Sequence, residues 1–188
     1  MTTTGPEILT LEEFQGLFPA LPTQRAEEYF PHFLSACKEF DIVTPARIAA
    51  FAAQVAHESL QLLYWEEIAS GDAYEGRADL GNTEPGDGRR FKGRSPIMLT
   101  GRANYRKAGA ALGVDLEGQP ELAATPEVGF RVAGWYWKTW GCNELADAGD
   151  FRKLTFRING GYTHYVERFF HWRRCCKVMG LPEPVLTA

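Results

Sequence analysis

The sequence predicts a single, mainly α-helical domain that carries one long irregular loop. Apolar residues recur at spacings of three and four in several stretches, which is the period of one helix face. Residues typical of helix N-caps open three of these stretches, and a long glycine-rich segment divides the helices into two groups. With 188 residues, of which 45% are hydrophobic, the chain can bury one core without disulfides or a structural metal.

Three helices are predicted in the N-terminal third of the chain. Thr10 is followed three residues later by a glutamate, the pattern of a capping box that opens a short helix. Residues 23–40 have a helical pattern, which we expect Pro31 to interrupt. Thr44 and Pro45 supply an N-cap and a first-turn proline for a third helix.

A sharp change of composition over residues 70–94 predicts a long irregular excursion. Six glycines fall in it, at Gly71, Gly76, Gly81, Gly86, Gly88 and Gly93. Loops of this length in compact domains are usually functional, so we expect this one, or a small hairpin within it, to form one wall of a cleft. Helices are expected again from Ile97 and over 126–140, 151–158 and 163–179.

Charge and cysteine content exclude several classes of protein. The net charge of -4 gives no support for nucleic-acid binding, which usually requires a basic excess. The four cysteines lack the paired spacing of a zinc site, and the neighbours Cys175 and Cys176 do not suit a disulfide with each other. We therefore expect buried, reduced thiols, no metal and no cofactor.

The N-terminal segment and the hydropathy pattern predict where the chain is found. Residues 1–12 lack a basic region followed by an apolar run, so we expect no signal peptide and a product made in the cytoplasm of the host cell. No apolar run is long enough to predict membrane insertion. A substrate in the periplasm or cell wall would require a separate route through the inner membrane. We expect a monomer.

Glu58 is the first candidate for chemistry. The apolar stripe of the third helix, formed by Ile48, Phe51 and Val55, continues onto Glu58, so that a carboxyl group falls on the buried face. A buried carboxyl group either finds a donor or keeps its proton, and a retained proton is what a general acid requires. The alternatives are a structural ion pair with an arginine and exposure at the helix end.

Acid–base hydrolysis of a glycosidic bond needs a second carboxyl group across the scissile bond. Six acidic residues are candidates from the sequence: Glu66, Glu67, Glu75, Asp79, Glu84 and Asp87. Glu75 precedes Gly76, and a glycine there permits close approach of the backbone to a ligand. The pattern alone does not choose among the six.

Several ordered motifs together resemble a known family. They are Ala56-His57-Glu58-Ser59, the segments 74–83 and 91–105, Ala146 to Phe151, and Arg157-Ile158-Asn159-Gly160-Gly161-Tyr162. These motifs are similar to those of the family 19 chitinases, and most closely to the phage endolysin branch of that family. The likeness covers about residues 46–181, so we expect one catalytic domain over 1–188 with an N-terminal helical part at 1–45.

The resemblance implies a lysozyme-like α+β fold and hydrolysis with inversion at the anomeric carbon. The expected substrate is the β-1,4-linked glycan of peptidoglycan, with chitin as the alternative. By the same resemblance Glu58 is the general acid, Glu75 the base that activates water, and Thr100 the residue that holds the water. The residues implied to contact substrate or support the site are His57, Asn104, Tyr105, Asn159 and Arg168.

The chain departs from the family pattern at three places. Leu60 and Gln61 stand where many relatives have two glycines, and Ser95 replaces a common glycine. Met98 stands where a substrate-binding glutamine is usual, which removes one hydrogen bond to a sugar. These departures predict a reshaped substrate cleft.

Two other hypotheses remain at this level. A wall-binding module could keep the fold without the chemistry, although the presence of both Glu58 and Glu75 argues against it. Metal-assisted hydrolysis would use His57, His164 and His171 as ligands. However, no second metal ligand lies at helical spacing from His57.

Overall fold

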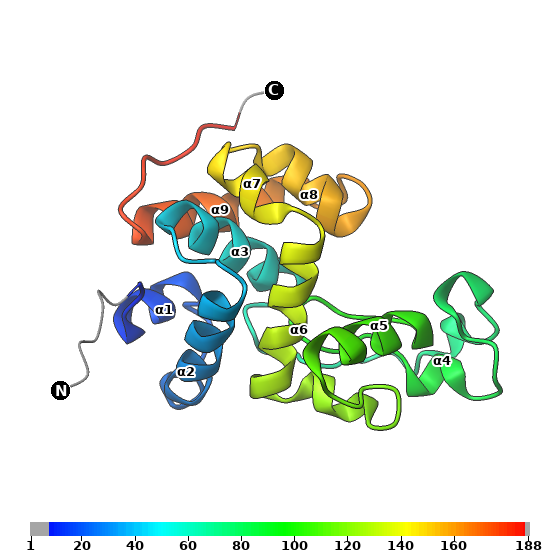
Figure 1. Ribbon diagram of the computed structural model, residues 1–188. Coiled ribbons are helices and arrows are strands. Elements are labelled where there is room, and N and C mark those ends of the chain that lie inside the picture. The colour runs from blue at the N-terminus through cyan, green and yellow to red at the C-terminus, as the bar shows by residue number, and fades with distance from the viewer. Residues whose placement is uncertain (1–7, 187–188) are drawn as a thin grey trace.

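The computed structural model describes residues 8–186, in which nine α-helices and three short 3-10 helices follow one another (Figure 1). Residues 1–7, part of the segment expected to carry no signal peptide, and residues 187–188 lie outside the described part. Within 8–186, no helix combines the length and apolarity needed to cross a bilayer. The elements are α1 Leu11–Leu17, α2 Thr23–Glu39, α3 Pro45–Glu58, η1 Asp72–Tyr74, η2 Ala78–Leu80, α4 Asp87–Arg90, α5 Arg102–Leu112, η3 Pro120–Ala124, α6 Pro126–Thr139, α7 Cys142–Asp147, α8 Phe151–Asn159 and α9 Tyr165–Val178.

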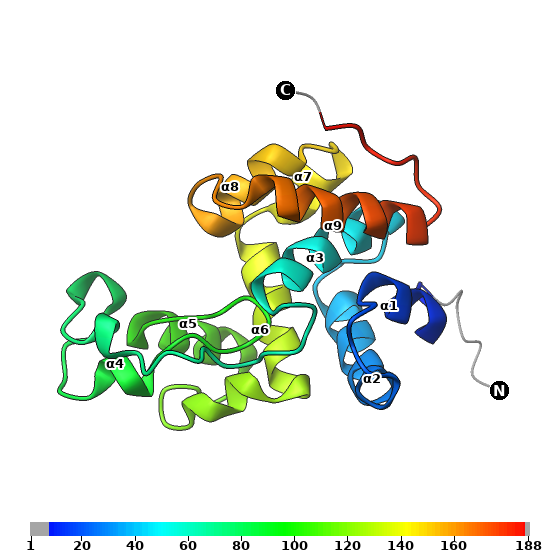
Figure 2. The same ribbon diagram turned by 180° about the vertical axis from the view of Figure 1, so that it is seen from behind.

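Helix α3 lies at the centre of the domain, in contact with α1, α7, α8 and above all α9 (Figures 1 and 2). Every residue from Ile48 to Ala56 is buried, and five of these nine are alanines. Small side chains let the neighbouring helices approach the α3 backbone closely. A helix enclosed in this way is held firmly by its surroundings, and its last residue is Glu58.

Helix α6 separates two sides of the molecule. On one side α2 packs against it, and on the other α4, α5 and the irregular segment form an arm (Figures 1 and 2). One hydrophobic cluster includes buried residues from both sides, from Leu9 before α1 to Cys176 in α9. The N-terminal helices therefore share their core with the rest of the chain, and the prediction of a mainly helical single domain is confirmed.

The predicted starts of α1 and α3 are confirmed. The Thr10 side chain accepts a hydrogen bond from the Glu13 amide, and the Glu13 carboxylate accepts one from the Thr10 amide at 2.7 Å, which completes the capping box. At α3 the Thr44 hydroxyl accepts a bond from the Arg47 amide at 3.2 Å.

The interruption expected at Pro31 is wrong, because α2 runs through this residue. Pro31 lies on the exposed face of the helix. Tyr29 and Phe33, on either side of it, are buried in the core. Their packing holds the helical conformation despite the missing backbone donor of proline.

Two other boundaries differ from the sequence pattern. Helix α5 begins at Arg102 rather than near Ile97, because Met98 has a left-handed backbone with φ 55°. Helix α7 was not predicted, since six residues are too few to display a helical period.

In the loop 70–94 the described residues form η1, η2 and α4 rather than a hairpin. The β-type pairing seen within 8–186 consists of isolated bridges from Arg94 to Glu66 and Leu99.

Three consecutive residues after α3 have a left-handed backbone. The φ angles of Leu60, Gln61 and Leu62 are 48°, 60° and 64°. The Ser59 hydroxyl accepts a hydrogen bond from the Leu62 amide at 2.8 Å and helps to hold this turn. Such a conformation costs a residue other than glycine about 1–2 kcal/mol, whereas glycine adopts it freely. The departure from two glycines at Leu60 and Gln61 therefore has a cost in stability.

All four cysteines are free and buried, as the sequence predicts. Desolvation raises the pKa of Cys142 and Cys175 to about 12, and that of Cys176 to about 11. Because the thiolate is the reactive form, these thiols are chemically inert near neutral pH.

Close packing between α2 and α6 yields a test of the core. A Cβ added to Gly134 in α6 would overlap the ring of Phe40. We expect Gly134→Ala to lower the free energy of unfolding by about 1–3 kcal/mol, although alanine is the better helix former. Gly161→Ala, where a Cβ would meet nothing closer than 3.8 Å, should change it little. Urea denaturation measures both, and equal stabilities for the two variants would contradict this account.

Candidate active site

Glu58 ends the buried helix α3 at the edge of a cavity. Its side chain is 21% exposed, and its Oε1 lies 2.5 Å from Nη2 of Arg168 in α9. The apolar stripe of α3 thus brings a carboxyl group to the margin of the core, as the sequence predicts. In this structure the carboxylate has an arginine as its partner, one of the outcomes that the sequence left open.

Arg168, in α9, connects Glu58 to Gln54 one turn earlier in α3 and to the end of α8. The arginine is buried, and its Nη1 donates a hydrogen bond to Oε1 of Gln54 at 2.6 Å. The Gln54 amide in turn donates to the Thr155 hydroxyl at 3.0 Å, while Nη2 of Arg168 lies 3.4 Å from Oδ1 of Asn159. This network fixes the position of the guanidinium group, and through it the orientation of the Glu58 carboxylate.

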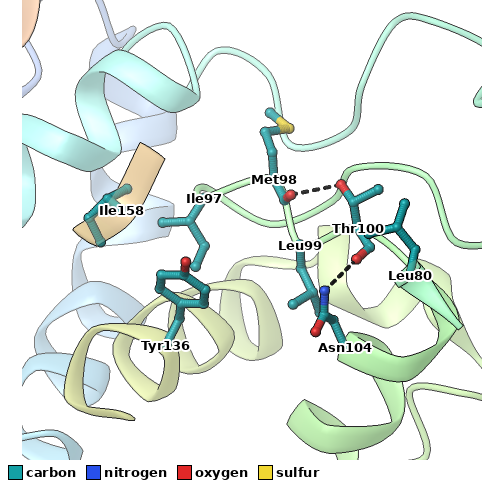
Figure 3. A pocket seen from close by; sticks show the side chains of 8 residues that line it. All are labelled: Leu80, Ile97, Met98, Leu99, Thr100, Asn104, Tyr136 and Ile158. Atoms are coloured by element: carbon teal, nitrogen blue, oxygen red, sulfur yellow. Dashed lines mark hydrogen bonds between the residues drawn. The ribbon is translucent and has the colours of Figure 1, made fainter. Parts of the chain in front are cut away.

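The cavity beside Glu58 contains two other carboxyl groups. It has a volume of about 320 Å³ and is lined by Glu58, Leu60, Tyr64, Glu66, Glu67, Ile68, Ala69 and Met98. Met98 also borders a second cavity of about 200 Å³, with Leu80, Ile97, Leu99, Thr100, Asn104, Tyr136 and Ile158 (Figure 3). A third, of about 260 Å³, shares Leu99, Asn104 and Tyr136 with the second. The shared residues show that the three cavities are neighbours, and we call them together the groove.

Glu66 and Glu67 differ in their surroundings. Glu66 pairs with Lys92 at 2.9 Å and with Arg94 at 3.2 Å. Desolvation acts to raise the pKa of Glu66, but the hydrogen bonds and positive charges of Lys92 and Arg94 outweigh it, and the pKa is lowered. Glu66 is therefore an ionised partner of two cations. Glu67, by contrast, forms no ion pair with any lysine, arginine or histidine within residues 8–186.

Glu67 is held by neutral donors, and both it and Thr100 lie next to Gly93. Its Oε1 accepts a hydrogen bond from the Tyr74 hydroxyl at 3.1 Å, and its Oε2 accepts one from the Gly93 amide at 3.1 Å. The space where Gly93 would carry a Cβ lies 3.2 Å from Oε2 of Glu67 and 3.4 Å from Oγ1 of Thr100. Thr100 donates its own proton to the Met98 carbonyl at 2.9 Å, so its lone pairs remain able to accept (Figure 3).

Glu75, which the family resemblance indicated as the base, is not brought to the cavity. Its two carboxylate oxygens accept hydrogen bonds from the amides of Gly86 and Gly88, at 2.7 and 2.8 Å. It thereby satisfies free amides at the start of α4. Helix α4 lies at the far end of the arm from α3 (Figures 1 and 2). The geometry therefore assigns Glu75 to holding the loop. Of the two acids that share a cavity with Glu58, Glu66 is paired with two cations and Glu67 is not.

The other expected site residues divide into two groups. Asn104 lines two of the three cavities, and its side-chain amide donates to the Thr100 carbonyl at 2.8 Å. Asn159 is exposed at the end of α8, beside Arg168. Tyr105, by contrast, is fully buried, and its hydroxyl donates to the Lys92 carbonyl at 2.7 Å. Tyr105 therefore does not line the cavities, and it supports the segment that carries Lys92 and Arg94.

His57 does not line any of the three cavities and belongs to a cluster of histidines between α3 and α9. The ring centroids of His164 and His171 lie 5.5 and 6.4 Å from that of His57. Glu167 approaches Nδ1 of His57 at 3.8 Å and Nδ1 of His164 at 3.3 Å. The three histidines named in the metal hypothesis do converge, but within 8–186 no group of three or more histidine, cysteine or acidic side chains has the geometry to hold a metal ion.

Comparison with known proteins identifies the family. The sequence profile of family 19 glycoside hydrolases, described as class I chitinase, matches residues 24–146. The chain belongs to glycoside hydrolase family 19. A family 19 domain-containing protein of Haemophilus influenzae is 36% identical over 102 residues, which are 54% of this chain and 49% of that protein. Endochitinase EP3 of Arabidopsis thaliana is 35% identical over 145 residues, 70% of this chain and 52% of the relative.

Solved structures of the family share the fold. The crystal structure of a bacterial family 19 chitinase superimposes with a TM-score of 0.78 at 25% identity, covering 95% of this chain and 98% of that one. Chitinase C from Streptomyces griseus also gives 0.78, at 24% identity, covering 99% and 82%. The lysozyme-like fold expected from the sequence is thus confirmed. This family 19 chain spans about half the length of the curated relatives named above.

The histidine cluster predicts how stability depends on pH. Desolvation, reinforced by the charge of Arg168, lowers the pKa of His57 to about 4, and desolvation with the charge of Arg174 lowers that of His171 to about 4. In the unfolded chain both titrate near pH 6.5. The unfolded state therefore binds more protons between these values, and stability is lost as pH falls through this range.

We expect the urea midpoint of the wild type to fall between about pH 6.5 and pH 5, above the range in which most carboxyl groups titrate. The double variant His57→Gln, His171→Gln should show a flatter profile in that range. A profile as steep as that of the wild type would contradict neutral burial of the two imidazoles.

Proposed function

We propose that this protein hydrolyses the β-1,4-linked glycan of peptidoglycan by inverting acid–base catalysis, with Glu58 as general acid and Glu67 as general base. The observation that carries the proposal is that these two carboxyl groups line one cavity, the first beside Arg168 and the second, like Thr100, next to Gly93. Inverting glycosidases use two carboxyl groups separated by enough space for a water molecule.

On the acid side, Glu58 in its protonated form gives its proton to the oxygen of the leaving sugar. The carboxylate that remains is the form that pairs with Arg168. Because the arginine is held by Gln54 and Asn159, its charge is already in place when the negative charge develops. Stabilisation that appears only as the reaction proceeds lowers the barrier rather than merely tightening substrate binding.

On the base side, Glu67 accepts a proton from the attacking water. The Tyr74 hydroxyl and the Gly93 amide orient its carboxylate without adding a positive charge, which would weaken it as a base. Thr100 donates to the Met98 carbonyl, so its free lone pairs accept a hydrogen bond from the same water and direct its oxygen to the anomeric carbon. The water adds to the face opposite the leaving group, and the configuration inverts.

The likeness of segments 74–83 and 91–105 to the endolysin branch supports peptidoglycan as the substrate. In this proposal the enzyme is made in the cytoplasm of the host cell and reaches the wall through a separate route. Chitin is the second candidate, because relatives such as the one from Arabidopsis thaliana are named endochitinases.

Substitution of the three acids tests the assignment of roles. We expect Glu58→Gln and Glu67→Gln to lower kcat by about 10²- to 10⁴-fold, the usual effect of losing a general acid or base. Glu75→Gln should keep its kcat and lose about 1 kcal/mol of stability, since it weakens hydrogen bonds to the α4 amides. Release of reducing ends gives kcat, and thermal unfolding gives stability. A Glu75→Gln enzyme as inactive as Glu58→Gln would overturn the choice of Glu67.

The substrate and the stereochemistry can be read from the products. We expect purified peptidoglycan to yield muropeptide fragments with a new reducing end, detected by mass spectrometry, and ¹H NMR to show the α-anomer as the first product. Cells with a permeabilised outer membrane should lyse. Release of chitin oligomers without any cleavage of peptidoglycan would favour the second candidate, and an initial β-anomer would exclude inversion.

A further inference from the structure

Three exposed apolar side chains stand on one side of the cavity that contains the two acids. Leu60, Tyr64 and Ile68 are 61%, 43% and 80% exposed, and all three line the same cavity as Glu58 and Glu67. We call these three residues the apolar wall. Met98, which occupies the position of a usual substrate-binding glutamine, continues the apolar lining between the first and second cavities.

The requirements of folding do not account for Leu60. Its side chain is mostly outside the core, so it contributes little to hydrophobic stabilisation. Its backbone is left-handed, with φ 48°, and the next two residues share this conformation. A glycine would adopt the same turn without strain and would expose no apolar surface. Two unfavourable features at one residue beside a reacting group are typical of a functional position.

The wall lies where a glycan must pass. A sugar whose glycosidic oxygen reaches Glu58 occupies the cavity that Leu60, Tyr64 and Ile68 line. The carboxylate of Glu66 at this cavity is already neutralised by Lys92 and Arg94. The wall therefore offers an apolar surface next to the scissile bond, and it suits a substituent with methyl groups better than it suits sugar hydroxyls.

The two candidate polymers differ in the substituents they carry there. Chitin carries hydroxyl and acetamido groups on every sugar. In peptidoglycan every second sugar carries a lactyl ether that is extended by a peptide, and this peptide begins with alanine. We propose that the apolar wall binds the methyl groups of this lactyl-alanyl segment and makes the enzyme selective for peptide-substituted glycan. The inference rests on the proposed function and adds to it the residues that determine specificity.

The test compares one glycan with and without its peptides. Glycan strands with intact stem peptides, and the same strands after an amidase has removed the peptides, are assayed for new reducing ends. The quantity of interest is the ratio of kcat/KM for substituted strands to kcat/KM for stripped strands. We expect Leu60→Asn and the double variant Leu60→Asn, Ile68→Ser to lower this ratio by roughly 10- to 100-fold.

The variants also distinguish an effect on substrate selectivity from an effect on the stability of the fold. Asparagine tolerates the left-handed conformation, so Leu60→Asn should unfold at the same or a higher temperature than the wild type while its ratio falls. Leu60→Met keeps an apolar side chain, and its ratio should stay close to that of the wild type. Val43→Ser removes an apolar side chain that is 39% exposed outside the groove, and it should leave the ratio unchanged.

Each outcome decides the inference. A ratio that falls only in the Leu60→Asn variants supports it. Equal losses on substituted and stripped strands would overturn it, because the wall would then contact groups that both strands carry, such as the acetamido groups and the lactyl ether that the amidase leaves in place. An unchanged ratio in every variant would overturn it as well, while peptidoglycan cleavage by the wild type would leave the proposed function intact. A wild type that cleaves chitin oligomers and neither form of peptidoglycan would reject the proposed function itself, and the inference with it.

Discussion

The ion pair between Glu58 and Arg168 is the interaction on which the rest of this site depends. It joins the end of α3 to the first turn of α9, and Gln54 of α3 and Asn159 at the end of α8 hold the arginine. A buried guanidinium group is costly unless a charge partner and hydrogen bonds compensate it. The close packing of α3 against α9 keeps these groups in register, so the same contacts that form the core also position the acid.

Much of the fold follows from local signals in the sequence. Thr10 and Thr44 mark helix starts by side-chain hydrogen bonds to nearby amides, which depend only on neighbouring residues. Pro31 shows the limit of such reasoning, because long-range packing of α2 decides whether its helix continues. The left-handed turn at Leu60 to Leu62 was not visible from propensity, since these residue types rarely adopt it.

Only the part of the site that lies on a regular helix could be predicted from the sequence. Glu58 could be placed by helical periodicity, because a regular element relates sequence position to direction in space. The second acid lies in an irregular segment, where sequence position does not predict the direction of a side chain. Glu67, which follows the end of α3 after residues 59–66, lines the same cavity as Glu58, whereas the loop carries Glu75 to the arm. Tyr105 lies within a motif of the family but is buried in the core. Only the tertiary structure shows whether such a residue lines the site or packs behind it.

The burial of all four thiols has a consequence for the chemistry of the whole molecule. No thiol is exposed at the surface for exchange, and no disulfide joins the four cysteines. The four cysteines are therefore protected from disulfide exchange under reducing and oxidising conditions alike. A protein of this kind needs no thiol-oxidising catalyst to mature, and it exists as one chemical species on either side of a redox boundary.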